Sequence, residues 1–147
     1  MRLLSLALIA ALSTPLPVLA APTQGEIAAA RLAYIDGDLT GALVVISEAA
    51  EAGNGMALNI LGAANDEGRS VQKVTFKAVD LFEQAAKAGE VRAYYNLGSI
   101  FALGSSEVAM DRKRAGLEFK AAAGLGYVPA MTALSKLAES ADPVDHG

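Results

Sequence analysis

The feature that most constrains the fold is an internal repeat. The segment from Gly53 to Gly89 aligns with the segment from Gly89 to Gly126, at steps of 36 and 37 residues. Within these segments Leu61-Gly62 corresponds to Leu97-Gly98. Partial copies extend the match toward both ends, so the chain holds three to four copies of one unit. A period of this length is typical of repeat proteins, in which each unit buries its apolar face against its neighbours.

The unit is predicted to be a helical hairpin. Ala57, Leu61 and Ala64 recur at the spacing of one helical face. Gly68 is placed to end that helix, because glycine adopts the left-handed conformation found at many helix ends. A second apolar stripe at helical spacing follows before Gly89, at Ala78, Leu81, Phe82, Ala85 and Ala86. Each copy therefore predicts a helix, a short loop and a second helix.

We expect one all-α domain. Alanine, the best helix former, dominates the chain, and no proline lies between Thr23 and Val128. The periodicity predicts seven helices, at residues 24–36, 39–52, 55–67, 75–88, 91–103, 111–124 and 127–140.

The repeat motif resembles the Sel1-like repeat, a longer relative of the tetratricopeptide repeat. Its best copy reads Ala57, Leu61, Gly62, Gly68, Val71, Lys77, Ala78, Phe82, Ala85, Ala86 and Gly89. There are departures: Val74 stands at the family's usual acidic position, Leu81 and Glu118 stand at its usual tryptophan, and Ser135 replaces a glycine. The resemblance covers residues 27–138 and implies a right-handed α-solenoid of three to four hairpins.

The resemblance also implies a binding groove. In the family the first helix of each hairpin lines the concave surface, and residues flanking the Leu-Gly pair project into it. Carried over by position, the groove residues are Met56, Asn59, Ala63, Asp66, Glu67, Arg92, Tyr95 and Ser99. Tyrosine and arginine are common in binding hot spots. Tyr95 has a second interpretation, in which it covers a gap between helices.

These features predict a non-catalytic scaffold, either an adaptor or a regulator in the bacterial cell envelope, that binds a peptide or protein in the concave groove. The resemblance leaves one alternative: binding or hydrolysis of cell-wall fragments or β-lactams. Relatives linked to that activity are rich in cysteine, and this chain has no cysteine.

The first 20 residues are predicted to be a secretory signal peptide. Arg2 precedes the apolar run from Leu3 to Leu12, and Val18-Leu19-Ala20 forms a small-residue cleavage site. Cleavage after Ala20 would leave a repeat domain at residues 21–141 and a flexible tail at 142–147. The run is too short for a stable membrane span, so we expect a periplasmic or secreted protein.

Composition and motifs argue against several other classes. The net charge of −4 does not favour nucleic acid, which requires clustered basic residues. The single histidine, His146, lies in the tail, and we expect no catalytic residue, metal or cofactor. The acidic loop that begins at Asp36 fails as a calcium loop, because Ser47 stands where the closing glutamate is needed. It is better interpreted as a turn in which Asp38 or Thr40 caps the next helix.

Self-association is a further possibility. The end units of a repeat array expose apolar faces unless polar residues cap them. The first predicted helix has a candidate uncapped face at Ile27, Ala28, Ala29, Leu32 and Ala33.

Overall fold

The computed structural model describes residues 20–69 and 73–140. Within these residues the chain forms seven helices: α1 (Gln24–Asp36), α2 (Leu39–Glu51), α3 (Gly55–Glu67), α4 (Thr75–Lys87), α5 (Val91–Leu103), α6 (Arg112–Gly124) and α7 (Val128–Glu139). Every predicted helix is confirmed, with each end within one residue. Residues 1–19 of the predicted signal peptide, Val71 of the motif, and the predicted tail with His146 lie outside the described residues.

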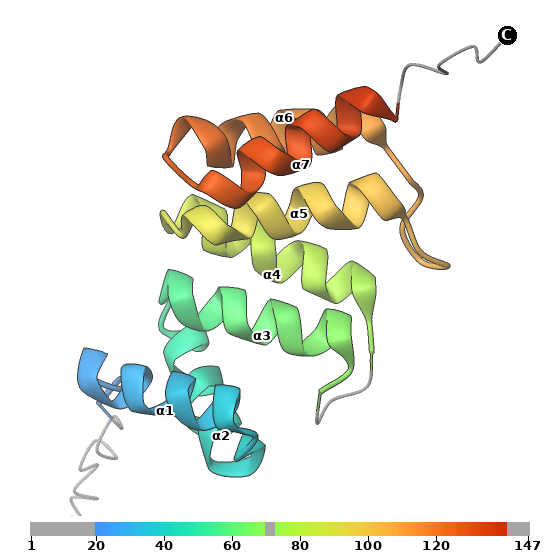
Figure 1. Ribbon diagram of the computed structural model, residues 1–147. Helices are drawn as coiled ribbons and strands as arrows, with labels where there is room; N and C mark the ends of the chain where they lie inside the picture. The colour runs from blue at the N-terminus through green and yellow to red at the C-terminus, as the bar shows by residue number, and fades with distance from the viewer. Residues whose placement is uncertain (1–19, 70–72, 141–147) are drawn as a thin grey trace, which may run out of the picture.

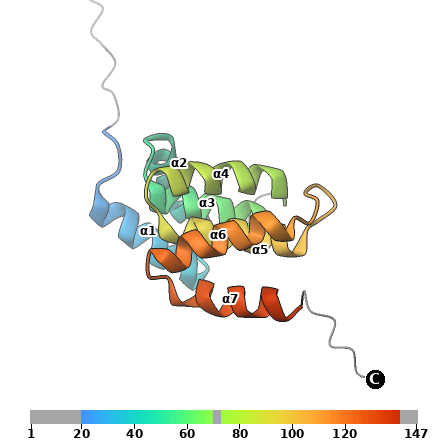
Figure 2. The ribbon, with the colours of Figure 1, turned by 90° about the horizontal axis from the view of Figure 1, so that it is seen from above.

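The helices form three stacked hairpins, α1–α2, α3–α4 and α5–α6, followed by α7. Figure 1 shows the stack running from α1 and α2 at one end to α6 and α7 at the other. Each helix packs against its neighbours in the chain, and the first helices also meet one another, α3 with α5 and α5 with α7. Seen from above in Figure 2, α7 lies on the opposite side of the molecule from α2 and α4. This arrangement is an all-α solenoid of helical hairpins.

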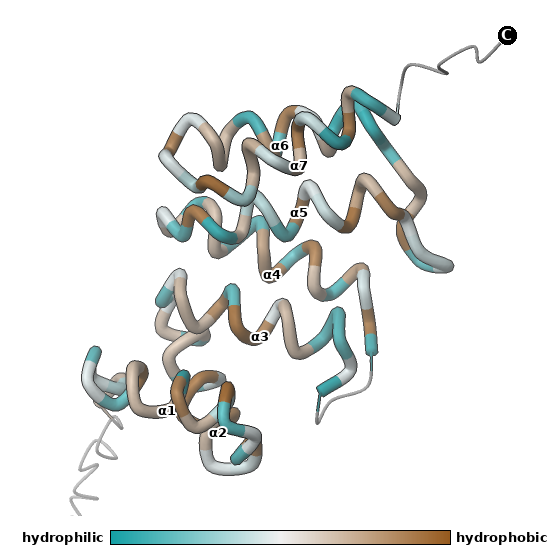
Figure 3. Tube along the Cα trace, viewed as in Figure 1, coloured by the Kyte–Doolittle hydropathy of each residue, from teal (hydrophilic) through white to brown (hydrophobic). Residues whose placement is uncertain are grey.

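The repeated Leu-Gly pair has a packing reason. A Cβ atom at Gly62 would lie 2.7 Å from the ring of Phe82, and one at Gly98 would lie 2.5 Å from the ring of Phe119. In both hairpins the phenylalanine of the second helix therefore lies directly against the backbone of the first. Phe82 and Phe119 are buried in one apolar core that runs through the stack. Figure 3 shows apolar and hydrophilic residues alternating along the helices that enclose this core.

Local signals set the helix ends. Gly68 has a φ of 73° and ends α3, while the side chain of Asn54 accepts a hydrogen bond of 3.0 Å from the Ala57 amide at the start of that helix.

The helix cap predicted at Asp38 is wrong. Asp38 is the residue before α2, but its side chain makes no capping hydrogen bond. Gly37, with a φ of 94°, makes the turn that separates α1 from α2.

The exposed face of α1 differs in part from the prediction. Ile27, expected on that face, is only 2% exposed because it points into the core. Ala28, Ala29 and Leu32 are exposed as expected. None of the described helices is both long enough and apolar enough to cross a membrane.

Candidate binding site between helices α2 and α4

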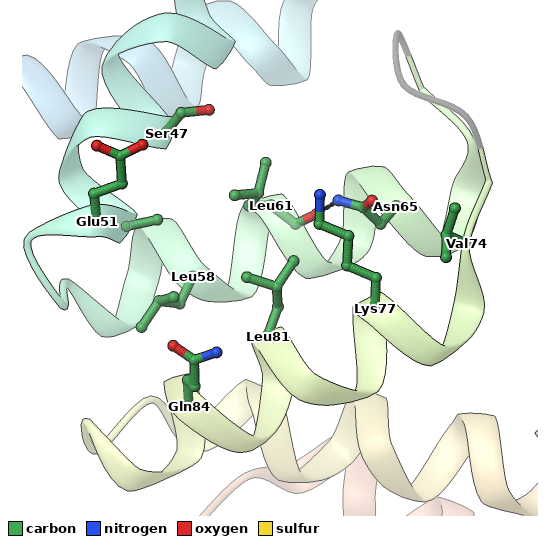
Figure 4. A pocket seen from close by; sticks show the side chains of 10 residues that line it. Ser47, Glu51, Leu58, Leu61, Asn65, Val74, Lys77, Leu81 and Gln84 are labelled. Atoms are coloured by element: carbon green, nitrogen blue, oxygen red, sulfur yellow. Dashed lines mark hydrogen bonds between the residues drawn. The ribbon is translucent and has the colours of Figure 1, made fainter.

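A hollow of about 640 Å³ lies between α2 and α4, and α3 supplies most of its floor. Both α2 and α4 pack against α3, and they are the second helices of adjacent hairpins. The hollow is therefore formed where two repeats join. Figure 4 shows side chains from all three helices directed toward it. A concave site of this size is large enough to take up a small ligand or several side chains of a partner.

The floor of the hollow is apolar. Leu58 of α3 and Leu81 of α4 are 4% and 8% exposed, and Leu61 of α3 is partly buried against the core. Leu81 stands at the position where the family usually has tryptophan, so this departure leaves a smaller side chain at the centre of the hollow. Asn65, also on the floor, donates from its Nδ2 to the Leu61 carbonyl oxygen at 2.8 Å, which holds its side chain in place.

The rim of the hollow is polar and carries both charges. Ser47 and Glu51 come from α2, whereas Lys77 and Gln84 come from α4. Figure 4 places Lys77 beside Asn65 at one end of the hollow, and Glu51 at the other end. Within residues 20–69 and 73–140, neither Glu51 nor Lys77 forms an ion pair. Both charged groups can therefore meet a ligand without first breaking an existing pair.

The described residues offer no cluster for metal chemistry. Among them, no group of three or more histidine, cysteine, aspartate or glutamate side chains is placed to hold a metal ion. The hollow presents instead an apolar floor, hydrogen-bonding groups and two opposite charges, all held by helices. These are properties of a recognition site.

The eight residues predicted to line a concave groove lie elsewhere, and two of them fill contacts between repeats. Asn59 is only 7% exposed, and its Oδ1 accepts a 2.8 Å hydrogen bond from Nδ2 of Asn96. Asn59 therefore does not project into an open groove, because it joins α3 to α5. Tyr95 packs with its ring centroid 5.7 Å from that of Phe119 and 5.4 Å from that of Tyr127.

Arg92 of the predicted groove is half-buried in an ion pair. Its Nε donates to Oε1 of Glu90 at 2.9 Å. Burial alone would raise the pKa of Glu90, but the hydrogen bonds and positive charge of Arg92, with a smaller contribution from Arg31, outweigh it and leave this pKa below its ordinary value. Glu90 is therefore held as a carboxylate that fixes the guanidinium group at the start of α5.

The remaining five predicted groove residues lie in three different surroundings. Met56 and Ala63 are partly buried against the core. Asp66 and Ser99 line a separate small hollow of about 150 Å³ between α3 and α5, while the exposed Glu67 lies 3.9 Å from Arg69 in a weak ion pair. The structure thus brings Asp66 and Ser99 together and places none of the eight residues in the hollow between α2 and α4. A binding role for these residues stays a prediction.

Comparison with known proteins identifies the repeat. No protein-family model and no curated protein matches the chain. Among solved structures, the chain is similar to a protective antigen present in uropathogenic Escherichia coli strains that displays an SLR (Sel1-like repeat) fold, with a TM-score of 0.72 and 26% identity over 77% of this chain. It is also similar to a Sel1 repeat protein from Oxalobacter formigenes, with a TM-score of 0.65 and 31% identity over 76% of this chain.

The chain is a Sel1-like repeat protein. It spans 25% of the length of the antigen and 47% of the length of the Oxalobacter protein. This Sel1-like repeat protein keeps the glycine and phenylalanine of the family motif in two hairpins. Gly62 meets Phe82 where α3 packs on α4, and Gly98 meets Phe119 where α5 packs on α6. The family resemblance stated from the sequence motif is therefore confirmed.

Sequence reasoning missed the rim of the hollow in this Sel1-like repeat protein. Ser47, Glu51, Lys77 and Gln84 are ordinary polar residues on helices, and no motif distinguishes them. The one sequence feature that pointed to open space here was Leu81, which is smaller than the tryptophan usual at this position in the family. The hollow itself depends on the spacing between α2 and α4, which arises when the repeats stack.

Proposed function

We propose that this Sel1-like repeat protein is a non-catalytic scaffold that binds a segment of a partner protein in the hollow between α2 and α4. The observation that supports this most directly is the hollow itself, with its apolar floor and oppositely charged rim. Its walls are helices packed into the solenoid core. Binding would then require little ordering of the scaffold, which reduces the entropic cost of association.

The lining residues suggest the chemistry of the partner segment. Leu58, Leu61 and Leu81 favour an apolar side chain at the centre. Lys77 favours an acidic group at one end, and Glu51 favours a basic group at the other. Complementary charges of this kind fix the orientation of a bound segment more than they add to its affinity.

We place this activity in the bacterial cell envelope. The support is the pattern of Arg2, the apolar run that follows and the cleavage-type residues before Ala21, which favour export. In this proposal the partner is a protein or peptide exposed to the periplasm or the medium, and the scaffold acts as an adaptor or a regulator.

Selection from a displayed peptide library tests the site. The purified chain would be used to select peptides, and the affinity of a selected peptide would be measured by fluorescence anisotropy. A variant with Glu51→Lys and Lys77→Glu keeps the net charge but reverses both ends of the hollow. We expect its affinity to fall at least about tenfold, which corresponds to a loss of about 1.4 kcal/mol.

The matched control is Glu48→Lys with Lys87→Glu. These residues are exposed on the same two helices, and the pair makes the same exchange of charge outside the hollow. We expect the control to bind like the native chain. An equal loss in both variants would contradict a specific site. Loss in an Arg92→Ala, Tyr95→Ala variant, with none in the hollow variant, would favour the concave groove instead.

A further inference from the structure

The hollow between α2 and α4 has an equivalent one repeat later, at the joint between α4 and α6. Both joints are formed by the second helices of adjacent hairpins, and in each the first helix of the later hairpin packs against both. The repeat steps of 36 and 37 residues relate every residue that lines the hollow to one residue of the second joint. The second joint therefore shows how the chain fills this space with its own side chains.

An ion-pair cluster occupies the second joint. Arg114 of α6 pairs with Glu83 of α4, and its Nε lies 3.5 Å from Oε1 of Glu118, one turn further along α6. The guanidinium carbon of Arg114 also lies 4.0 Å from the centre of the Phe101 ring of α5. Three helices thus supply two carboxylates and an aromatic ring that hold one cation.

The first joint keeps the cation and lacks the groups that would hold it. Lys77 corresponds to Arg114 and has the same charge. The three groups around Arg114 correspond to uncharged side chains in the first joint: Glu83 to Ser47, Glu118 to Leu81, and Phe101 to Asn65. All four counterparts line the hollow, and Figure 4 shows the Lys77 side chain ending beside Leu61 and Asn65. The hollow thus lies where the second joint has its cluster.

We propose that the partner segment supplies the missing carboxylate, as an aspartate or glutamate side chain that meets Lys77 beside Ser47. This inference rests on the proposed function, and it names the residue that anchors the bound segment. The carboxylate of the partner then takes the place at Lys77 that Glu83 takes at Arg114. An apolar side chain next to the acid covers the leucines of the floor.

A first test needs no partner, because the chain itself can be made to supply the carboxylate. Ser47→Glu and Ser47→Gln introduce side chains of equal length, with and without a charge. Each would be combined with native Lys77 and with Lys77→Met, so that the cycle removes the effects of neighbours such as Glu51. With Lys77 present, we expect the melting temperature of the glutamate variant to gain about 1–4 °C relative to glutamine, compared with the Lys77→Met background.

This gain should depend on pH and on salt. Below about pH 4 the introduced carboxylate is protonated, so the gain should be lost as the pH falls through that range. Salt should also reduce it, since charges are screened over about 8 Å at 0.15 M. A gain of zero at neutral pH and low salt would overturn the inference, because a carboxylate beside Ser47 would then not meet Lys77.

A second test uses a displayed-library peptide that binds the native chain and is weakened by the Glu51→Lys, Lys77→Glu exchange. Each acidic residue of this peptide would be replaced by its amide, and fluorescence anisotropy would give the affinity for the native chain and for Lys77→Met. One such replacement is expected to weaken binding to the native chain about fivefold, and to leave binding to Lys77→Met nearly unchanged. Ser47→Glu should weaken binding of the acidic peptide more than Ser47→Gln does, because its own carboxylate takes Lys77.

The outcomes separate this inference from the proposed function. Peptides that bind in the hollow without an acidic residue, or whose acid contributes equally with and without Lys77, would overturn the inference and leave the scaffold in place. If no selected peptide were weakened by the exchange at Glu51 and Lys77, the hollow would not be the binding site, and both proposals would be wrong.

Discussion

At the scale of single residues, the contact between Gly62 and Phe82 explains why the motif needs glycine inside a helix. Glycine normally weakens a helix interior by about 1 kcal/mol relative to alanine. Here the ring of Phe82 occupies the space that a Cβ atom would need. The same arrangement recurs at Gly98 and Phe119. The intrinsic cost of glycine is therefore offset by the close packing of the two helices in each hairpin.

Gly62→Ala is expected to destabilise the protein. A methyl group 2.7 Å from a buried ring forces the ring or the helix to move, and overpacking of this kind costs about 1–3 kcal/mol. This cost exceeds the gain of about 1 kcal/mol in helix propensity. We expect the free energy of unfolding, measured in urea, to fall by up to about 2 kcal/mol, the difference between these two effects.

Gly41→Ala is the matched control. Gly41 lies in α2, and a Cβ atom there would have no neighbour within 4 Å. Replacing it should raise the free energy of unfolding by about 0.4–1 kcal/mol. If both substitutions were stabilising, the packing explanation for Gly62 would be wrong.

At the scale of helices, the hydrogen bond between Asn59 and Asn96 joins successive hairpins. It links α3 to α5, which make few other contacts with each other. The Asn59 side chain is buried, so its amide oxygen needs this partner. The family pattern predicted that Asn59 faces an open groove. Asn59 is instead buried, because its side chain is paired with Asn96 of α5.

A double-mutant cycle measures this link. We expect Asn96→Ala to lower the free energy of unfolding by about 1–3 kcal/mol, because the Asn59 oxygen stays buried without its partner. Asn59→Ala and the double variant complete the cycle. The coupling energy should be about 0.5 kcal/mol or more. Additive losses from the two single variants would show that the bond contributes no specific linkage.

At the scale of the whole molecule, stability is expected to decline toward the α7 end. Only Ala130 of α7 is buried, whereas α3 has seven buried residues. Regions with few buried contacts open at low free energy. Native-state hydrogen exchange should therefore show lower amide protection in α7 than in α3. Equal protection in a strictly monomeric sample would contradict this view of the solenoid.

The sequence by itself determined the repeat, the seven helices and the family. These properties depend on local signals and on spacing: apolar periodicity, glycine at helix ends, and the Leu-Gly and Phe positions that recur in step. The second interpretation of Tyr95, as a residue that covers a gap between helices, also came from the sequence, and the Tyr95 ring on α5 does pack against the rings of Phe119 and Tyr127.

Only the tertiary structure decided where the surface is open. The hollow between α2 and α4 depends on the distance between two helices that are not adjacent in the chain, and that distance is set by how each packs on α3. The burial of Asn59 likewise depends on α5, which begins more than thirty residues later. A linear pattern identifies which face of a helix is apolar. The stacking of the repeats determines which faces are covered and which remain for a partner.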